Sequence, residues 1–229
     1  MSDASYATFK RDQVEQAIAI CSGINPQHEP KRFDALRIEL KRLLDRDRRQ
    51  EQETPRGRPI RRAFHDGPPP GRGIDVMYSG YEAFALLVAL RLMRGGLTQA
   101  RAVNFLRDLR VLLAGSHYEI LQTSRAQLRP YEDDDERSRL VRDGFLVDDA
   151  DKMVYLVALA GEKAEAFDLP SPADKPVSGN ICRTVRELQD RLVGASHEGH
   201  ALIVVELVNA AHQLAHYLDR IEPRARGRR

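Results

Sequence analysis

The segment from Ser79 to Gly96 limits the fold more than any other part of the chain. Ser79 is followed three residues later by Glu82, which is the spacing of a capping box at a helix N-terminus. The residues that follow are apolar on almost every side of a helix, and Gly95-Gly96 supplies a stop signal. A helix without a polar face has to be covered by other elements. The sequence therefore predicts that this helix lies at the centre of a core.

Two helices are predicted before this segment. The range 9–21 carries apolar residues at three- to four-residue spacing and is followed by Gly23, a stop signal. The range 32–48 has an apolar stripe and a largely basic outer face, diluted by four acidic residues. Between this helix and Ser79, residues 49–77 are rich in Arg, Gly and Pro, which excludes a continuous helix. They form either a linker or a hairpin with strands at 60–64 and 74–78.

The helical pattern continues after the central segment. Thr98 is expected to cap a helix whose buried face includes Leu112. Gly115 is a candidate interruption of this helix. The pattern then extends to Leu128, with Tyr118 facing inward.

Beyond an acidic run at residues 131–136, the pattern changes to shorter elements. Strands are predicted over 140–147, 153–159 and 201–207, and helices from Ser178 and over 209–221. The fold class is therefore mainly α with a small α+β C-terminal part. The predicted domains are a helical one at 1–130 and a small α+β one at 131–229.

Charge is distributed unevenly along the chain. The formal net charge of the 229 residues is +2, but residues 1–114 carry +6 and residues 131–175 carry −7. The last ten residues, 220–229, carry +4. The near-neutral total therefore does not exclude a polyanionic partner. The uneven distribution indicates that such a partner binds residues 1–114 or the C-terminal residues 220–229.

The chain carries no specific signature of an enzyme or a cofactor site. Its cysteines, Cys21 and Cys182, lie far apart and outside any CxxC, so free thiols are expected. Glycine-rich phosphate loops and nucleophile elbows are absent. We therefore expect no enzyme, no cofactor and no metal. The least favoured hypothesis is a metal-dependent hydrolase built on the late histidines His197, His200, His212 and His216.

The helix pair at 9–21 and 32–48 fits the requirements of a helix-turn-helix, although an ordinary solvated helix pair remains the alternative. The second helix of that motif needs an apolar inner stripe and polar or basic outer residues that enter the major groove. Arginines from the following segment would neutralise phosphates, as a wing does. The candidate groove contacts are Arg37, Lys41 and Arg42. The candidate phosphate contacts are Arg58, Arg61, Arg62 and Arg72.

Two short stretches follow an order of residues found in a known family. Met77–Phe84 lies where a wing would meet the next helix, and Leu92–Gln99 reads as a Gly-containing turn before a further helix. Through these stretches, residues 74–106 resemble the DNA-binding half of MerR-type transcription regulators. The resemblance implies a winged helix-turn-helix in the N-terminal half and binding to double-stranded DNA.

We therefore expect a cytoplasmic DNA-binding protein, a bacterial-type transcription regulator or architectural factor, that works as a homodimer. The longest apolar runs are too short for a membrane span, and the first residues lack a secretory signal. The alternative is a non-enzymatic protein–protein interaction or adaptor role, in which the charge blocks select the partner.

Overall fold

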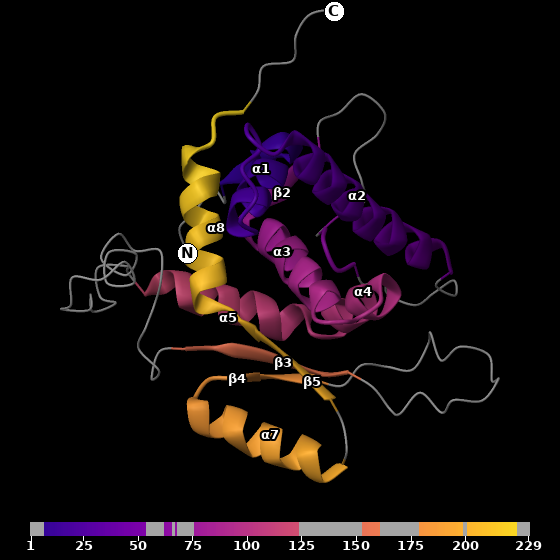
Figure 1. The fold of residues 1–229 in the computed structure, drawn as a ribbon, viewed down its shortest axis with the longest axis vertical. Helices are drawn as coiled ribbons and strands as arrows, with labels where there is room; N and C mark the ends of the chain where they lie inside the picture. The colour runs from indigo at the N-terminus through magenta and orange to yellow at the C-terminus, as the bar shows by residue number, and fades with distance from the viewer. Residues whose placement is uncertain are drawn as a thin grey trace, which may run out of the picture. The chain divides into compact units, whose positions relative to one another are not determined.

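A computed structural model describes residues 7–53, 62–65, 67, 76–123, 153–160, 179–198 and 201–223 (Figure 1). The described part is mainly helical and contains one two-stranded and one three-stranded antiparallel sheet. The mainly helical class that the sequence predicts is confirmed, together with a small sheet in the C-terminal part.

The chain forms two compact units. Unit 1 contains residues 1–87 and 213–229, and unit 2 contains residues 88–212. The division falls inside helix α3 (Gly80–Arg94) and helix α8 (Val208–Arg220). The domain boundary predicted between residues 130 and 131 lies outside the described residues.

Unit 1 begins with strand β1 (Thr8–Lys10), helix α1 (Arg11–Cys21) and helix α2 (Pro30–Glu53). Strand β1 pairs antiparallel with β2 (Met77–Ser79), which directly precedes α3. Helix α1 ends before Gly23, whose φ of +70° is a conformation that glycine adopts without strain. The two predicted front helices are confirmed. Helix α2 is longer than predicted because good helix formers, Arg, Gln and Glu, continue to its end.

The predicted hairpin after α2 is wrong in its strand pairing. Its second strand overlaps β2, which pairs with β1. Its first strand was placed at 60–64, and the described residues of that range are not in a strand. The carboxylate of Asp47 on α2 accepts the backbone amides of Ala63 at 3.1 Å and Phe64 at 3.3 Å, so these donors do not serve a β ladder. Most of the predicted hairpin tip lies outside the described residues.

The central helix α3 has the caps that the sequence predicts. The amide of Ser79 donates to Glu82 Oε2 at 2.8 Å, and the amide of Glu82 donates to Ser79 Oγ at 3.2 Å. Residues 83–90 are each at most 2% exposed, which confirms a helix buried on all sides. Gly96, with a φ of +109°, follows its C-terminal end.

Unit 2 continues with helices α4 (Gln99–Asp108) and α5 (Arg110–Gln122). The side chain of Thr98 accepts the amide of Arg101 at 3.4 Å, so the predicted cap of α4 is confirmed. The helix breaks at Leu109, however, and not at Gly115. The buried residues of α5 are Leu113, Ser116, His117 and Ile120. Leu112 and Tyr118 were predicted to face inward and are instead 56% and 59% exposed.

The three-stranded sheet of unit 2 is antiparallel, with strand order β4-β3-β5. Its elements are β3 (Tyr155–Ala160), β4 (Gly179–Cys182) and β5 (Ala201–Glu206), with helix α7 (Val185–Glu198) between β4 and β5. Figure 1 shows α7 lying along one face of this sheet. The strands predicted at 153–159 and 201–207 and the helix at 209–221 are confirmed, whereas the strand at 140–147 lies outside the described residues.

The helix predicted to start at Ser178 starts later. Residues Gly179–Cys182 form β4 because they pair with β3. Helix α7 is then capped by Thr184, whose Oγ1 accepts the amide of Glu187 at 3.1 Å. Glu187 Oε2 in turn accepts the amide of Arg183 at 2.7 Å.

Candidate nucleic-acid interface

Most of the exposed residues of α2 between residues 31 and 49 are basic. Of the four acids between residues 31 and 49, only Asp34 is exposed, because Glu39 and Asp45 are half-buried and Asp47 is 2% exposed. Folding therefore turns most of these acidic residues away from solvent and leaves most of the basic residues in the same range exposed. Seven exposed cations form what we call the α2 basic face: Lys31, Arg32, Arg37, Lys41, Arg42, Arg48 and Arg49.

The α2 basic face is long and lies on a rigid element. At 1.5 Å per residue, the helix rises about 27 Å from residue 31 to residue 49. Four of its cations make no hydrogen bond or ion pair with any residue that the structure describes. These are Lys31, Lys41, Arg48 and Arg49. A row of uncompensated cations of this length offers several contacts to one polyanion.

Glu15 joins α1 to α2 beneath one edge of this face. Its carboxylate is 5% exposed and accepts Arg11 Nε at 2.6 Å and Arg37 Nε at 2.8 Å. The hydrogen bond from Arg37 to Glu15 raises the pKa of the guanidinium, so it stays charged. Because two cations surround it, the buried carboxylate is compensated, and the pairing fixes α2 on α1.

A second buried cluster holds the chain that follows α2 against β2. Asp47 binds the amides of Ala63 and Phe64, and the next residue, His65, stacks on Tyr78 with ring centroids 5.2 Å apart. His65 Nδ1 also lies 3.9 Å from Glu82 Oε1. Burial raises the pKa of the Tyr78 phenol to about 12, so it is neutral and not a base. The cluster is therefore an anchor for residues 62–65.

The sequence-predicted site residues fall into three groups. Lys41 and Arg42 are exposed on α2 as predicted, and Arg37 is exposed but tied to Glu15. Arg62 is described and half-exposed. Arg58, Arg61 and Arg72 lie outside the described residues.

Sequence reasoning missed both carboxylates that hold the face in place. Glu15 lies on the buried side of α1, four residues after Arg11, and an acid in such a position signals an internal ion pair. Asp47 lies on the apolar side of α2, and the same signal applies. Neither pattern names the partner, which is 22 residues away for Glu15 and 16 for Asp47.

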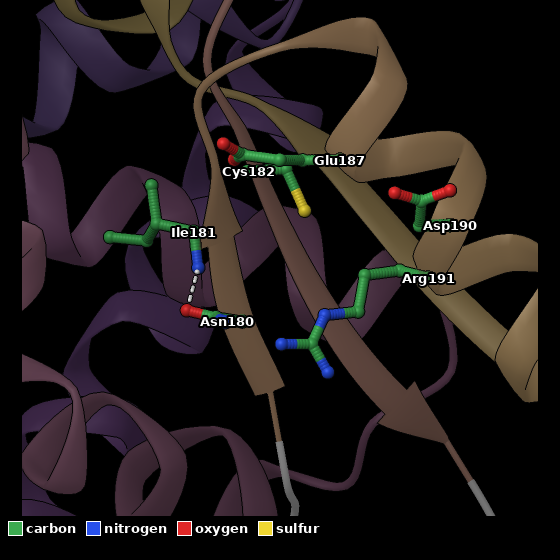
Figure 2. A pocket seen from close by; sticks show the side chains of 6 residues that line it. All are labelled: Asn180, Ile181, Cys182, Glu187, Asp190 and Arg191. Carbon is green, nitrogen blue, oxygen red and sulfur yellow. Dashed lines mark hydrogen bonds between the residues drawn. The ribbon is translucent and has the colours of Figure 1, made fainter.

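Unit 2 has a pocket of about 400 Å³ between β4 and α7 (Figure 2). The residues that line it are Asn180, Ile181, Cys182, Glu187, Asp190 and Arg191. Cys182 is a free thiol, and burial raises its pKa. The pocket therefore presents a neutral thiol and not an activated nucleophile.

Among the described residues, the late histidines do not form the cluster that the metal hypothesis requires. In the part of the chain that the structure describes, no group of three or more His, Cys, Asp or Glu residues is arranged to hold a metal ion. His200, one of the four, lies outside that part. His212 is buried, and its charge acts on His117 of α5.

His117 makes the stability of unit 2 dependent on pH. Burial first, and His212 second, lower its pKa from 6.5 to about 4. Protonation thus favours the unfolded chain, and the stability that is complete above pH 6.5 is lost as the pH falls toward 4. Between pH 7 and pH 5 we expect the free energy of unfolding of the wild type to fall by about 2 kcal/mol because of His117. The variant His117→Asn should lack this contribution. Urea unfolding at both pH values measures it.

The comparison with His117→Asn is necessary because the titration of Glu206 changes the stability in the opposite direction as the pH falls. Burial raises the pKa of Glu206, so its protonation favours the folded state as the pH falls. This contribution is common to both proteins and cancels in the difference. Equal pH dependence of the two proteins would contradict a neutral buried His117.

Within the described residues, no helix has both the length and the apolarity to cross a membrane. No family model, no curated protein and no solved structure matches the chain.

Proposed function

We propose that the protein binds double-stranded DNA through the α2 basic face, as a bacterial-type transcription regulator or architectural factor. The observation that carries this proposal is the sorting of charge on α2. Seven cations are exposed between residues 31 and 49, against one exposed acid, Asp34. Such a surface favours a partner with closely spaced negative charges, and phosphates along a duplex provide them.

The proposal assigns different roles to the predicted residues. Lys41 and Arg42 are the contacts to the DNA groove. Arg37 positions α2 through its ion pair with Glu15, and the exposed edge of its guanidinium faces the DNA backbone. The MerR-type resemblance of residues 74–106 supports DNA binding and a non-enzymatic role. The flanking phosphate contacts are Arg58, Arg61, Arg62 and Arg72.

The salt dependence of binding tests this proposal. If Lys31, Lys41, Arg42, Arg48 and Arg49 each displace one counterion from the duplex, α2 alone should make log K fall with log salt at a slope of about −4 to −5. Affinity for a 25-base-pair duplex would then drop roughly 500-fold between 50 and 200 mM salt. Fluorescence anisotropy measures it. Absence of binding at 50 mM salt, or a slope near zero, overturns the proposal.

A second candidate function, protein–protein interaction, is favoured by one face of α5. Val111 is 84% exposed and Leu112 and Tyr118 are more than half exposed, which is an unusual cluster for an isolated chain. Gly115 lies between them, and a Cβ there would meet nothing within 4 Å. If two copies of α5 crossed antiparallel at Gly115, Leu112 of each copy would lie against Tyr118 of the other. That is the self-complementarity of a twofold dimer.

The oligomeric state tests this second candidate. The double variant Leu112→Ser with Tyr118→Ser should convert a dimer to a monomer in sedimentation velocity at 50 µM. Leu192→Ser, an exposed apolar residue on α7, should leave the dimer unchanged. A wild-type monomer at this concentration, or a double variant that still dimerises, would exclude pairing through α5.

A further inference from the structure

The pocket between β4 and α7 has the size and the chemistry of a small-molecule site. Its volume of about 400 Å³ lies in the range of ligand pockets. In Figure 2, the side chain of Arg191 extends from α7 toward β4, and its guanidinium lies beside the strand that carries Asn180 and Cys182. One wall is therefore a strand and the other a helix, and a cation reaches across between them.

Arg191 is the main donor in this pocket. It makes no hydrogen bond or ion pair with any residue that the structure describes. A guanidinium offers a planar fork of N–H donors that matches the two oxygens of a carboxylate. Asn180 adds a second donor, because its Oδ1 accepts the amide of Ile181 at 2.8 Å and its NH₂ group remains for a ligand.

The remaining groups select the charge of the ligand. The carboxylate of Glu187 is engaged at the N-terminus of α7, where its Oε2 accepts a hydrogen bond from the amide of Arg183 at 2.7 Å. Asp190 is exposed and still carries a negative charge near the pocket. Cys182 is a neutral thiol, so it does not repel an anion. Because Glu187 and Asp190 repel negative charge, they disfavour a dianion such as phosphate more than a ligand with one negative charge.

We propose that this pocket binds a small molecule that carries a single carboxylate, held by Arg191 and by the amide of Asn180. The site lies in unit 2 and uses no residue of α2. It is therefore independent of the proposed DNA binding, and a failure of either proposal leaves the other standing.

Amide NMR titration of the full chain tests the pocket. Butyrate, benzoate and glycine, each raised to 20 mM, should produce saturable shifts of the amides of residues 180–182 and of the Arg191 Nε–H signal with at least one of the three. Arg191→Gln should weaken that binding at least tenfold, and Arg191→Lys should weaken it less, because lysine keeps the charge and loses the fork.

The matched control is Arg186→Gln, which removes an exposed arginine on α7 that does not line the pocket. Its affinity for the same carboxylate should equal that of the wild type. Thermal unfolding of the Arg191 variants should match the wild type, since the side chain is exposed. The proposal is overturned if none of the three carboxylates gives saturable shifts, if Arg191→Gln binds as tightly as the wild type, or if inorganic phosphate binds more tightly than the carboxylates.

Discussion

Replacing Lys41, Arg42 and Arg49 with glutamine is expected to weaken binding to duplex DNA by roughly 500- to 1,000-fold at 100 mM salt. Each cation that neutralises a phosphate releases a counterion, so each loss removes about tenfold in affinity at this salt concentration. The slope of log K against log salt should become less negative by about 2 to 3. Fluorescence anisotropy over a series of salt concentrations measures both quantities.

The control for this variant removes the same amount of charge elsewhere. Arg94, Arg186 and Arg220 are exposed on α3, α7 and α8, outside the α2 basic face. Their triple replacement with glutamine also lowers the net charge by three, yet affinity should stay within roughly threefold of the wild type, because only long-range attraction changes. Equal losses in the two triple variants would mean that net charge, and not α2, governs binding.

Gly179→Ala is expected to lower the free energy of unfolding by about 3 kcal/mol. A Cβ at Gly179 would lie 2.4 Å from the carbonyl oxygen of Val157 and 2.5 Å from the ring of Phe105. The oxygen belongs to the neighbouring strand and the ring is 1% exposed, so neither can move without disturbing the sheet or the core. Urea unfolding followed by circular dichroism measures the loss.

Gly194→Ala is the matched substitution within the same unit. Gly194 lies inside α7, and a Cβ there would meet nothing within 4 Å. Because alanine favours a helix more than glycine does, this variant should be more stable than the wild type by about 0.5–1 kcal/mol. If Gly179→Ala were as stable as Gly194→Ala, β4 would not pack against Phe105.

Local signals in the sequence were sufficient to locate most helices. Ser79 with Glu82, Thr98, Gly23 and Gly96 act within one turn of their helix, so their spacing predicts the observed caps. The phase of α5 was not predictable in this way. The break at Leu109 has no glycine or proline to mark it, and Leu112 and Tyr118 are exposed beyond it although Leu113 is buried as predicted.

Contacts between distant residues decided the rest. Strand β2 pairs with β1, where Ser79 lies opposite Thr8. Neither three-residue segment has a local pattern that specifies this pairing. The same is true of the candidate site. The spacing of apolar residues in α2 is enough to predict its basic side. The burial of Asp47 and the pairing of Arg37 with Glu15 depend on tertiary contacts. The burial of Asp47 is one reason why the exposed charge of α2 is more basic than its composition.

The most direct measurement of the central claim is an NMR titration of the arginine Nε–H groups with a 25-base-pair duplex at 100 mM salt. If the α2 basic face binds DNA, the signals of Arg42, Arg48 and Arg49 should shift and saturate together. The signals of Arg94 and Arg186, on α3 and α7, should not move. Shifts at Arg94 or Arg186 with the α2 arginines unchanged would contradict the account.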